Sequence, residues 1–330
     1  MSKSPKGSVL ITGANGFVGS RLCRRLMDDG YNVIAGIRKG CDDSLINDLK
    51  IERRYGDITC PETLTDMVKN VDYLVHNAGL VKAKSIQQFA RVNQEGTENI
   101  LRAAVQGSEL KRFIYISSMA AAGPSKPNSP LTEEMPTHPI TAYGNSKAAG
   151  ESVVMAFKQK VNVVIIRPPA VYGPGDIEMF SFFQSLNNRI KPYLGNWHRK
   201  IQLVHVDDLA FGVSQALKAN VKSGAVYFIA ESRSYKYSEL VKHLGKAVGR
   251  AALPIYIPGW GLKSIAFISE KVMKMLGRPP MFTVEKAREL LENWEVSAEK
   301  AKRELEYESQ IPFAEGARQT VYWYREEGWL

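Results

Sequence analysis

The sequence predicts an α/β fold in which a doubly wound parallel sheet carries a smaller, mostly helical C-terminal lobe. Short apolar runs alternate with helical patterns through the first half of the chain. A glycine-rich turn joins the first apolar run to the first helical pattern. From about residue 232 the alternation gives way to helical segments of less regular spacing. These three observations favour a sheet domain followed by a helical lobe.

The expected strands are short runs rich in β-branched and aromatic residues. They are SVLIT (8–12), NVIAGI (32–37), a run that precedes Asp57, VDYLVH (71–76), RFIYIS (112–117), VNVVIIR (161–167) and AVYFIA (225–230). The helical patterns between them include 16–29, 85–105 and 148–158, and later ones cover PGWGLKSIAFISEKVMKMLG (258–277) and EGARQTVYWYREEGWL (315–330). Repeats of strand, helix and strand predict a parallel sheet covered on both faces, with ligands at the carboxyl ends of its strands.

The composition predicts a globular, cytoplasmic protein. Of the 330 residues 44% are hydrophobic, and no run of about 18 apolar residues could span a bilayer. The start MSKSPKGSVL leads into a strand without the apolar region of a signal peptide. Cys23, Cys41 and Cys60 have no CxxC spacing and form no ligand pattern with the five histidines, so we expect neither disulfides nor a metal.

The formal net charge of +10 does not by itself indicate nucleic acid. The basic pairs, such as Arg24-Arg25 and Lys111-Arg112, are dispersed and form no stripe interleaved with aromatic residues. We expect solvated basic faces and no nucleic-acid partner. A membrane contact is also not expected, except that the apolar segment around Trp260 leaves a membrane or a protein partner open.

The segment ITGANGFVGS predicts a dinucleotide site. Gly13, Gly16 and Gly19 fall between the first strand and its helix, where backbone without side chains can approach a pyrophosphate that faces the helix N-terminus. At the end of the second strand, Arg38 and Lys39 stand where an acid would bind the ribose of NAD, so NADP is favoured and NAD remains possible. The alternative is that Arg38 stacks on adenine or points to solvent.

Other polar residues follow the next strands. Asp57 offers an acceptor for the adenine amino group, or caps a helix. His76 is interpreted as a packed, hydrogen-bonded histidine. At TAYGNSK, Tyr143 and Lys147 lie four residues apart and share a helix face, so that an ammonium group could lower the pKa of the phenol. With 14 tyrosines in the chain, such a pair could also arise by chance at the start of an ordinary amphipathic helix.

The order of the motifs is more specific than any one of them. It runs through the glycine turn, Asp57, HNAG (76–79), VNQEGT (92–97), Ser117-Ser118, YGNSK (143–147), RPPAVYGPG (167–175) and VHVDD (204–208). In this order the chain resembles the extended short-chain dehydrogenase/reductases of the NAD(P)-dependent epimerase/dehydratase family over nearly its whole length. In its motif details it is most similar to the branch of dihydroflavonol reductases and 3-beta-hydroxysteroid dehydrogenases. The resemblance implies a Rossmann-type sheet domain.

The resemblance also implies roles for individual residues. Tyr143 would be the acid/base, Lys147 would hold the nicotinamide ribose and depress the tyrosine pKa, and Ser118 in preference to Ser117 would bind the substrate oxygen. The implied cofactor contacts are Gly13, Asn15, Gly16, Phe17, Val18, Gly19, Arg38, Asp57, Ile58, Asn77, Ala78, Gly79, Asn93, Tyr143, Lys147, Pro168, Ala170 and Val171. The expected substrate contacts are Val81, Met119, Ala120, Tyr172, Phe180 and Trp197. For Asn93, plain helix packing is an equal alternative.

Departures from the family pattern bear on the substrate. A 4,6-dehydratase has an Asp-Glu pair where this chain has Met119-Ala120, and the GDP-fucose branch has a cysteine at Met119. Many sugar-nucleotide members carry an arginine at the position of Ile201, although His198, Arg199 and Lys200 just upstream could compensate. We therefore expect an NAD(P)-dependent oxidoreductase that interconverts a ketone and a secondary alcohol on a hydrophobic molecule. A nucleotide-sugar epimerase and a non-catalytic, cofactor-retaining binding protein are the alternatives.

The expected domains follow from these motifs. Residues 1–175, with about 201–231 returning to the sheet, form the NAD(P)-binding domain, and about 176–200 and 232–330 form the substrate lobe. In the family, helices of this kind pair across a two-fold axis, so a homodimer through 85–105 and 148–158 is expected.

Overall fold

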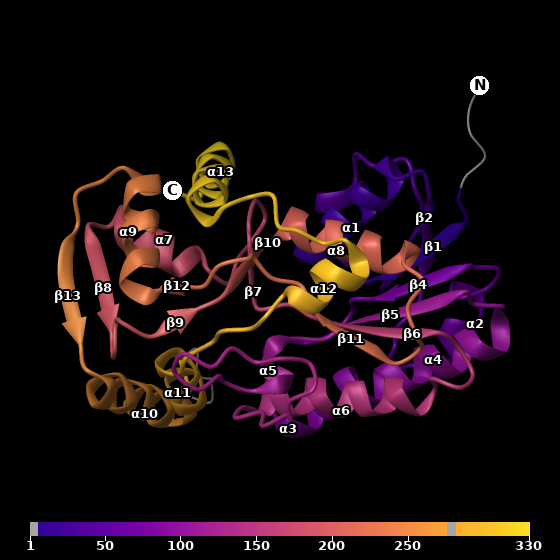
Figure 1. Cartoon of the computed structure of the whole chain (residues 1–330), viewed down its shortest axis with the longest axis horizontal. Helices are drawn as coiled ribbons and strands as arrows, with labels where there is room; N and C mark the ends of the chain where they lie inside the picture. The colour runs from indigo at the N-terminus through magenta and orange to yellow at the C-terminus, as the bar shows by residue number, and fades with distance from the viewer. Residues whose placement is uncertain (1–5, 276–281) are drawn as a thin grey trace.

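The computed structural model describes residues 6–275 and 282–330, so the last two residues of the helical segment expected over 258–277 lie outside it. A seven-stranded parallel sheet forms the larger part (Figure 1). Its strands are β1 (Ser8–Thr12), β2 (Asn32–Ile37), β3 (Glu52–Tyr55), β4 (Tyr73–His76), β5 (Arg112–Ile116), β6 (Val163–Arg167) and β11 (Ala225–Phe228). The order β11-β6-β5-β4-β1-β2-β3 reverses direction between β1 and β4, which is where ligands bind in doubly wound sheets.

Successive side chains of the strands point alternately into two separate apolar cores. In β1, Val9 and Ile11 point into one apolar cluster, whereas Leu10 points into the other. The first cluster lies under α1 (Phe17–Asp28) and α8 (Val206–Lys218), and the second under α2 (Leu64–Met67), α4 (Gly96–Gly107) and α6 (Ala142–Ala156). Both faces of the sheet are therefore covered, which confirms the predicted fold class.

The C-terminal half builds a smaller lobe at the other end of the molecule (Figure 1). Its elements are α7 (Phe180–Asn187), β8 (Ile190–Leu194), β9 (Lys200–Ile201), β12 (Tyr235–Lys236), α9 (Tyr237–Val248), β13 (Leu253–Ile257), α10 (Gly259–Met275), α11 (Val284–Leu291) and α13 (Phe313–Glu326). Between this lobe and the sheet, β7 (Ala170–Tyr172) pairs in parallel with β10 (Leu203–His205). The remaining short elements are η1 (Ser44–Ile46), η2 (Pro61–Thr63) and α5 (Met119–Ala122). No helix in the described ranges is both long and apolar enough to cross a bilayer.

Two features differ from the sequence-based expectation. Helix α12 (Glu299–Leu305), placed by the sequence in the substrate lobe, packs on the sheet domain because Ala301 and Leu305 join the core beneath α8. The helix expected over 85–105 is broken into α3 (Ile86–Phe89), a π-helical segment η3 (Ala90–Glu95) and α4. Irregular π segments inside helices often accompany functional sites.

Candidate active site

The glycines between β1 and α1 have different structural roles. Gly13 adopts a φ of +67°, which favours glycine. A Cβ on Gly19 would lie 2.0 Å from the carbonyl oxygen of Gly13, so a side chain there would separate the helix from the turn. A Cβ on Gly16 would meet nothing closer than 3.5 Å within the chain. Open backbone at the start of α1, with the free amides of a helix N-terminus, suits the pyrophosphate of a dinucleotide.

The next two strands bring Arg38 and Asp57 to the same edge. Arg38 is exposed directly after β2, and Asp57 follows β3. Burial acts to raise the pKa of Asp57, but hydrogen bonds from Thr59 and the charges of Arg38 and Arg91 outweigh it and lower that pKa. The Arg38 side chain is therefore close enough to act on Asp57 and remains accessible to an anionic ligand. The basic environment fits the 2'-phosphate of NADP.

The end of β4 is fastened to the glycine turn. The amide of Ala78 donates to Thr12 Oγ1 at 3.1 Å, and Asn77 Nδ2 donates to the carbonyl oxygen of Gly13 at 3.3 Å. The His76 ring lies between Thr12 and Thr97, and burial, with a smaller effect of the Lys147 charge, lowers its pKa to about 3. His76 is thus a neutral packed histidine, as the sequence indicated.

Asn93, in the π-helical segment, joins two parts of the site. Its Oδ1 accepts from the amide of Leu80 at 2.8 Å, and its Nδ2 donates to the carbonyl oxygen of Leu80 at 3.0 Å. The same Nδ2 donates to Ser146 Oγ at 2.8 Å, and Ser146 Oγ donates to the carbonyl oxygen of Tyr143. Asn93 therefore holds the loop after β4 against the start of α6, which favours a positioning role over plain helix packing.

The two serines after β5 point to different partners. Ser117 Oγ donates to Glu151 Oε1 at 2.5 Å, inside the core. Ser118 begins α5, where its Oγ accepts from the amide of Ala120 at 3.1 Å, and its hydroxyl lies near enough to the Tyr143 phenol to oppose the rise of that pKa. Of the two hydroxyl groups, Ser118 therefore lies beside the phenol.

Helix α6 presents Tyr143 through its first turn. Thr141 begins the helix, with its side chain accepting from the amide of Gly144 at 3.0 Å. Burial raises the pKa of Tyr143 to about 12, which the nearby Ser118 hydroxyl opposes and the charges of Glu289 and Glu178 reinforce. In the chain by itself, this phenol is a weaker acid than an ordinary tyrosine.

Lys147 lies one turn further along α6 and is buried. Its Nζ donates to the carbonyl oxygen of Ile116 at 2.6 Å and lies 4.3 Å from the centre of the Tyr115 ring. Burial lowers the pKa of Lys147 to about 7, although the Glu151 carboxylate acts to raise it. Lys147 is not among the groups that shift the pKa of Tyr143 in the chain alone, so its expected effect on the phenol stays a prediction for the complex with cofactor.

A buried ion pair lies behind the lysine and was missed by the sequence analysis. Arg167 binds both oxygens of Glu151, with Nε to Oε1 at 2.9 Å and Nη2 to Oε2 at 2.6 Å. The side chains are 7% and 8% exposed, so water screens the pair little. The available signal was the spacing, since Tyr143, Lys147 and Glu151 recur every four residues on one helix face.

The expected substrate residues divide into two groups. Met119, Ala120 and Tyr172 are buried, Met119 against Phe228 and Trp294, while Phe180 packs on Tyr324 and Trp329. Their side chains thus serve core packing in this arrangement. Val81 and Trp197 are exposed. Trp197 lines an apolar hollow of about 460 Å³ together with Tyr193, Tyr256 and Leu291.

The cations near the family's diphosphate position are engaged within the chain. Arg199 is buried, donates from Nη1 to the carbonyl oxygen of Leu194, and stacks 4.0 Å from the centre of the Tyr237 ring. Lys200 Nζ pairs with Glu295 at 2.9 Å. Ile201 belongs to β9 and packs into the lobe core. Arg199 and Lys200 could therefore replace the arginine that is missing at Ile201 only if their side chains moved.

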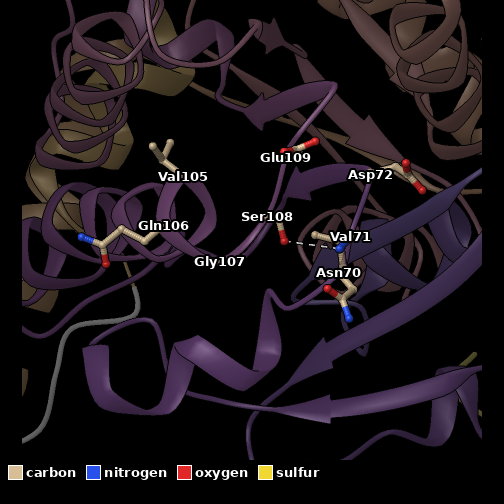
Figure 2. Close-up of a pocket in the computed structure, with 8 residues that line it drawn as sticks. All are labelled: Asn70, Val71, Asp72, Val105, Gln106, Gly107, Ser108 and Glu109. Carbon is tan, nitrogen blue, oxygen red and sulfur yellow. Dashed lines mark hydrogen bonds between the residues drawn. The ribbon is translucent and has the colours of Figure 1, made fainter.

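A larger hollow of about 570 Å³ lies at the opposite edge of the sheet (Figure 2). It is lined by the turns before β4 and β5, where Ser108 Oγ accepts from the amide of Val71 at 3.3 Å. These turns precede the strands, whereas Tyr143, Ser118 and the glycine turn gather at the carboxyl ends. This hollow is thus remote from the candidate active site.

Comparisons with known proteins find relatives along the whole chain. The family model described as "NAD dependent epimerase/dehydratase family" matches residues 9–230. A ceramide reductase of Caulobacter vibrioides is 31% identical over 332 residues, covering 100% of this chain and 98% of that one. A UDP-glucose 4-epimerase of Vibrio cholerae is 29% identical, covering 79% of this chain and 81% of that one. The crystal structure of gox2253 superposes with a TM-score of 0.84 at 27% identity, covering 98% of this chain and 99% of that one.

Proposed function

Since the chain belongs to the NAD dependent epimerase/dehydratase family, whose members act on CH–OH groups, we propose that it interconverts a ketone and a secondary alcohol on a hydrophobic molecule. The observation that carries this proposal is the meeting of Ser118 and Tyr143 with Lys147 one helical turn away. A phenol and a neighbouring hydroxyl suit one carbonyl oxygen, to which both can donate.

We propose NADP as the cofactor, and its bound nicotinamide would supply or accept the hydride. The open Gly16 backbone and the exposed Arg38 would hold its phosphates, and Lys147 would bind the nicotinamide ribose. Tyr143 transfers a proton between its phenolic oxygen and the substrate oxygen. Ser118 donates a hydrogen bond to the same oxygen. Asn93 fixes the start of α6, so that the phenol stays in place.

An amphiphilic lipid ketone is the substrate class best supported. Lys200 is paired with Glu295, and Arg199 is buried against the Tyr237 ring, so neither cation is presented to a diphosphate at the surface, and burying a diphosphate without them would be costly. The ceramide reductase matches over the full length of both chains. Val81 and Trp197, both exposed, remain the proposed substrate contacts.

A nucleotide-sugar epimerase is the second candidate, because the UDP-glucose 4-epimerase also matches. A binding protein that retains its cofactor without turnover is a weaker candidate, because Ser118, Tyr143 and Lys147 are all present. We also propose a homodimer through the helices over 85–105 and 148–158, whose assembly light scattering would measure.

The reaction is tested by following NADPH absorbance with detergent-dispersed long-chain ketones, steroid-like ketones and UDP-glucose. We expect turnover with a long-chain ketone, and a Tyr143→Phe variant that binds NADPH but is slower by about 10² to 10⁴-fold. A Phe variant at the parent rate would contradict the role of Tyr143. Epimerisation of UDP-glucose without ketone reduction would favour the second candidate.

A further inference from the structure

Helix α10 is apolar on two faces, and within residues 6–275 and 282–330 only one of them is covered. Leu262 and Ala266 are buried against α9 and α11 in the lobe core. A second stripe leaves Ile265, Ile268, Val272 and Met275 exposed, with Ile268 60% and Met275 87% exposed. Spacings of three, four and three residues align these four side chains along one face. We call them the outer stripe.

Neighbouring residues extend this apolar surface. Trp260, at the start of α10, is 76% exposed, and β13 exposes Leu253, Ile255 and Tyr256. Figure 1 places α10 and β13 together at the end of the molecule far from β1 and β2. Exposed apolar side chains gathered at one end of a molecule can mark an interaction site, and tryptophan and tyrosine are the side chains that favour membrane–water interfaces.

The exposed charged side chains of α10 itself are basic. Lys263 and Lys271 are exposed on α10. Between residues 187 and 200 and between 250 and 275 the only acidic residue is Glu270, which accepts from the amide of Val284 within the chain. Two copies meeting through this surface would bring the lysines of α10 together, and the exposed Glu285 of the adjacent α11 already accepts from the amide of Ala142, whereas an anionic lipid surface would pair these lysines.

We propose that the outer stripe and β13 dock on an anionic membrane, with α10 lying in the plane of the interface. The apolar side chains enter the boundary of the acyl chains, and Lys263 and Lys271 meet the headgroups, as in interfacial amphipathic helices. The surface is also connected to the catalytic helix. Helix α10 packs on α11, where Glu285 Oε2 accepts from the amide of Ala142, the first residue of α6.

Membrane docking goes beyond the proposed function, because it rests on the exposed surface and does not require a particular ketone. For an amphiphilic substrate it has a clear use. Docking would hold the lobe at the bilayer in which such a lipid resides. The apolar hollow at Trp197 and Tyr256 adjoins β13 and lies on this side of the lobe.

The test is cosedimentation of the full chain with vesicles of phosphatidylglycerol and phosphatidylcholine in equal parts, and with vesicles of phosphatidylcholine alone. We expect binding to the mixed vesicles that weakens about fivefold for each of Lys263→Gln and Lys271→Gln. The double variant Ile268→Gln/Val272→Gln should weaken binding by at least tenfold. Tyr322→Gln, which replaces an exposed aromatic side chain on α13, is the matched control and should bind like the parent.

Each result decides for or against docking. No binding of a folded parent chain to either vesicle, or equal losses in Tyr322→Gln and the double variant, would overturn the proposal. A dimer that only the double variant dissociates, seen by light scattering without vesicle binding, would assign the outer stripe to a second copy. Turnover of a water-dispersed ketone, measured on the same preparations, should survive the double substitution. A parent chain that does not turn over this ketone would count against the proposed function. The vesicle-binding result would be unaffected, so the two failures can be told apart.

Discussion

Gly16 and Gly19 belong to the same turn, yet alanine should affect them in opposite ways. At Gly19 the added Cβ would lie 2.0 Å from a backbone oxygen, about 1.4 Å inside the 3.4 Å at which ordinary contact begins. Both sides of this clash are backbone, so no side chain can rotate to relieve it. We expect Gly19→Ala to lower the free energy of unfolding by about 1–3 kcal/mol or more, as overpacking does.

At Gly16 the same methyl group meets only the Gly13 oxygen, at 3.5 Å, and its φ of −83° is open to alanine. The poorer helix cap costs up to about 1 kcal/mol, and the loss of unfolded-chain entropy offsets about 0.4–1 kcal/mol of that. The stability of Gly16→Ala should therefore stay close to that of the parent. Its methyl group would instead occupy the space proposed for the pyrophosphate, which should weaken cofactor binding about tenfold or more.

Thermal unfolding with and without NADPH separates the two effects. At a cofactor concentration of 100 times the parent Kd, binding stabilises the parent by about 2.7 kcal/mol, and a tenfold weaker Gly16→Ala variant by only about 1.4 kcal/mol. Without cofactor, only Gly19→Ala should melt early. The reasoning would be refuted if Gly16→Ala lost stability without cofactor while keeping the full NADPH effect.

Three further substitutions, with Ser117→Ala as a control, test other side chains of the site. Arg38→Ala should erode the preference for NADP over NAD about tenfold, measured by titrating both cofactors, because a charged phosphate contact contributes about 1.5–3 kcal/mol. Lys147→Met tests the lysine pKa of about 7. Because the unfolded lysine keeps its proton up to about pH 10.5, the stability of the parent relative to this variant should rise from pH 7 to 9, by at most about 1.4 kcal/mol per pH unit. A stability difference that does not change with pH would contradict this pKa. Glu151→Gln should destabilise the chain by about 3–5 kcal/mol in urea unfolding, because Arg167 loses its buried partner, and Ser117→Ala, which keeps that pair, should cost clearly less.

Local patterns were sufficient for the elements that build the cofactor edge. The strand runs and the glycine turn obey rules of period and backbone conformation that act within a few residues, so the parallel sheet was predictable. The return of α12 to the sheet domain was not, because Ala301 and Leu305 contact a core formed more than 70 residues earlier in the sequence. Likewise, Phe180 has the same local pattern whether it faces a substrate or packs on Tyr324, and only the fold decides between them.

Helix α6 shows why the pair of Tyr143 and Lys147 was ambiguous in the sequence. An ordinary amphipathic helix buries apolar side chains, but α6 buries Lys147 and Glu151 together with small residues. Gly150 allows this, since a Cβ there would lie 2.7 Å from the carbonyl oxygen of Asn93 and closer still to the Tyr115 hydroxyl. Burying two charges lowers stability unless each has a partner, and here Arg167 and the Ile116 carbonyl oxygen provide them. A helix whose buried face is charged and tightly packed is better explained by the site that it serves than by the fold, because apolar side chains would stabilise the same helix more simply.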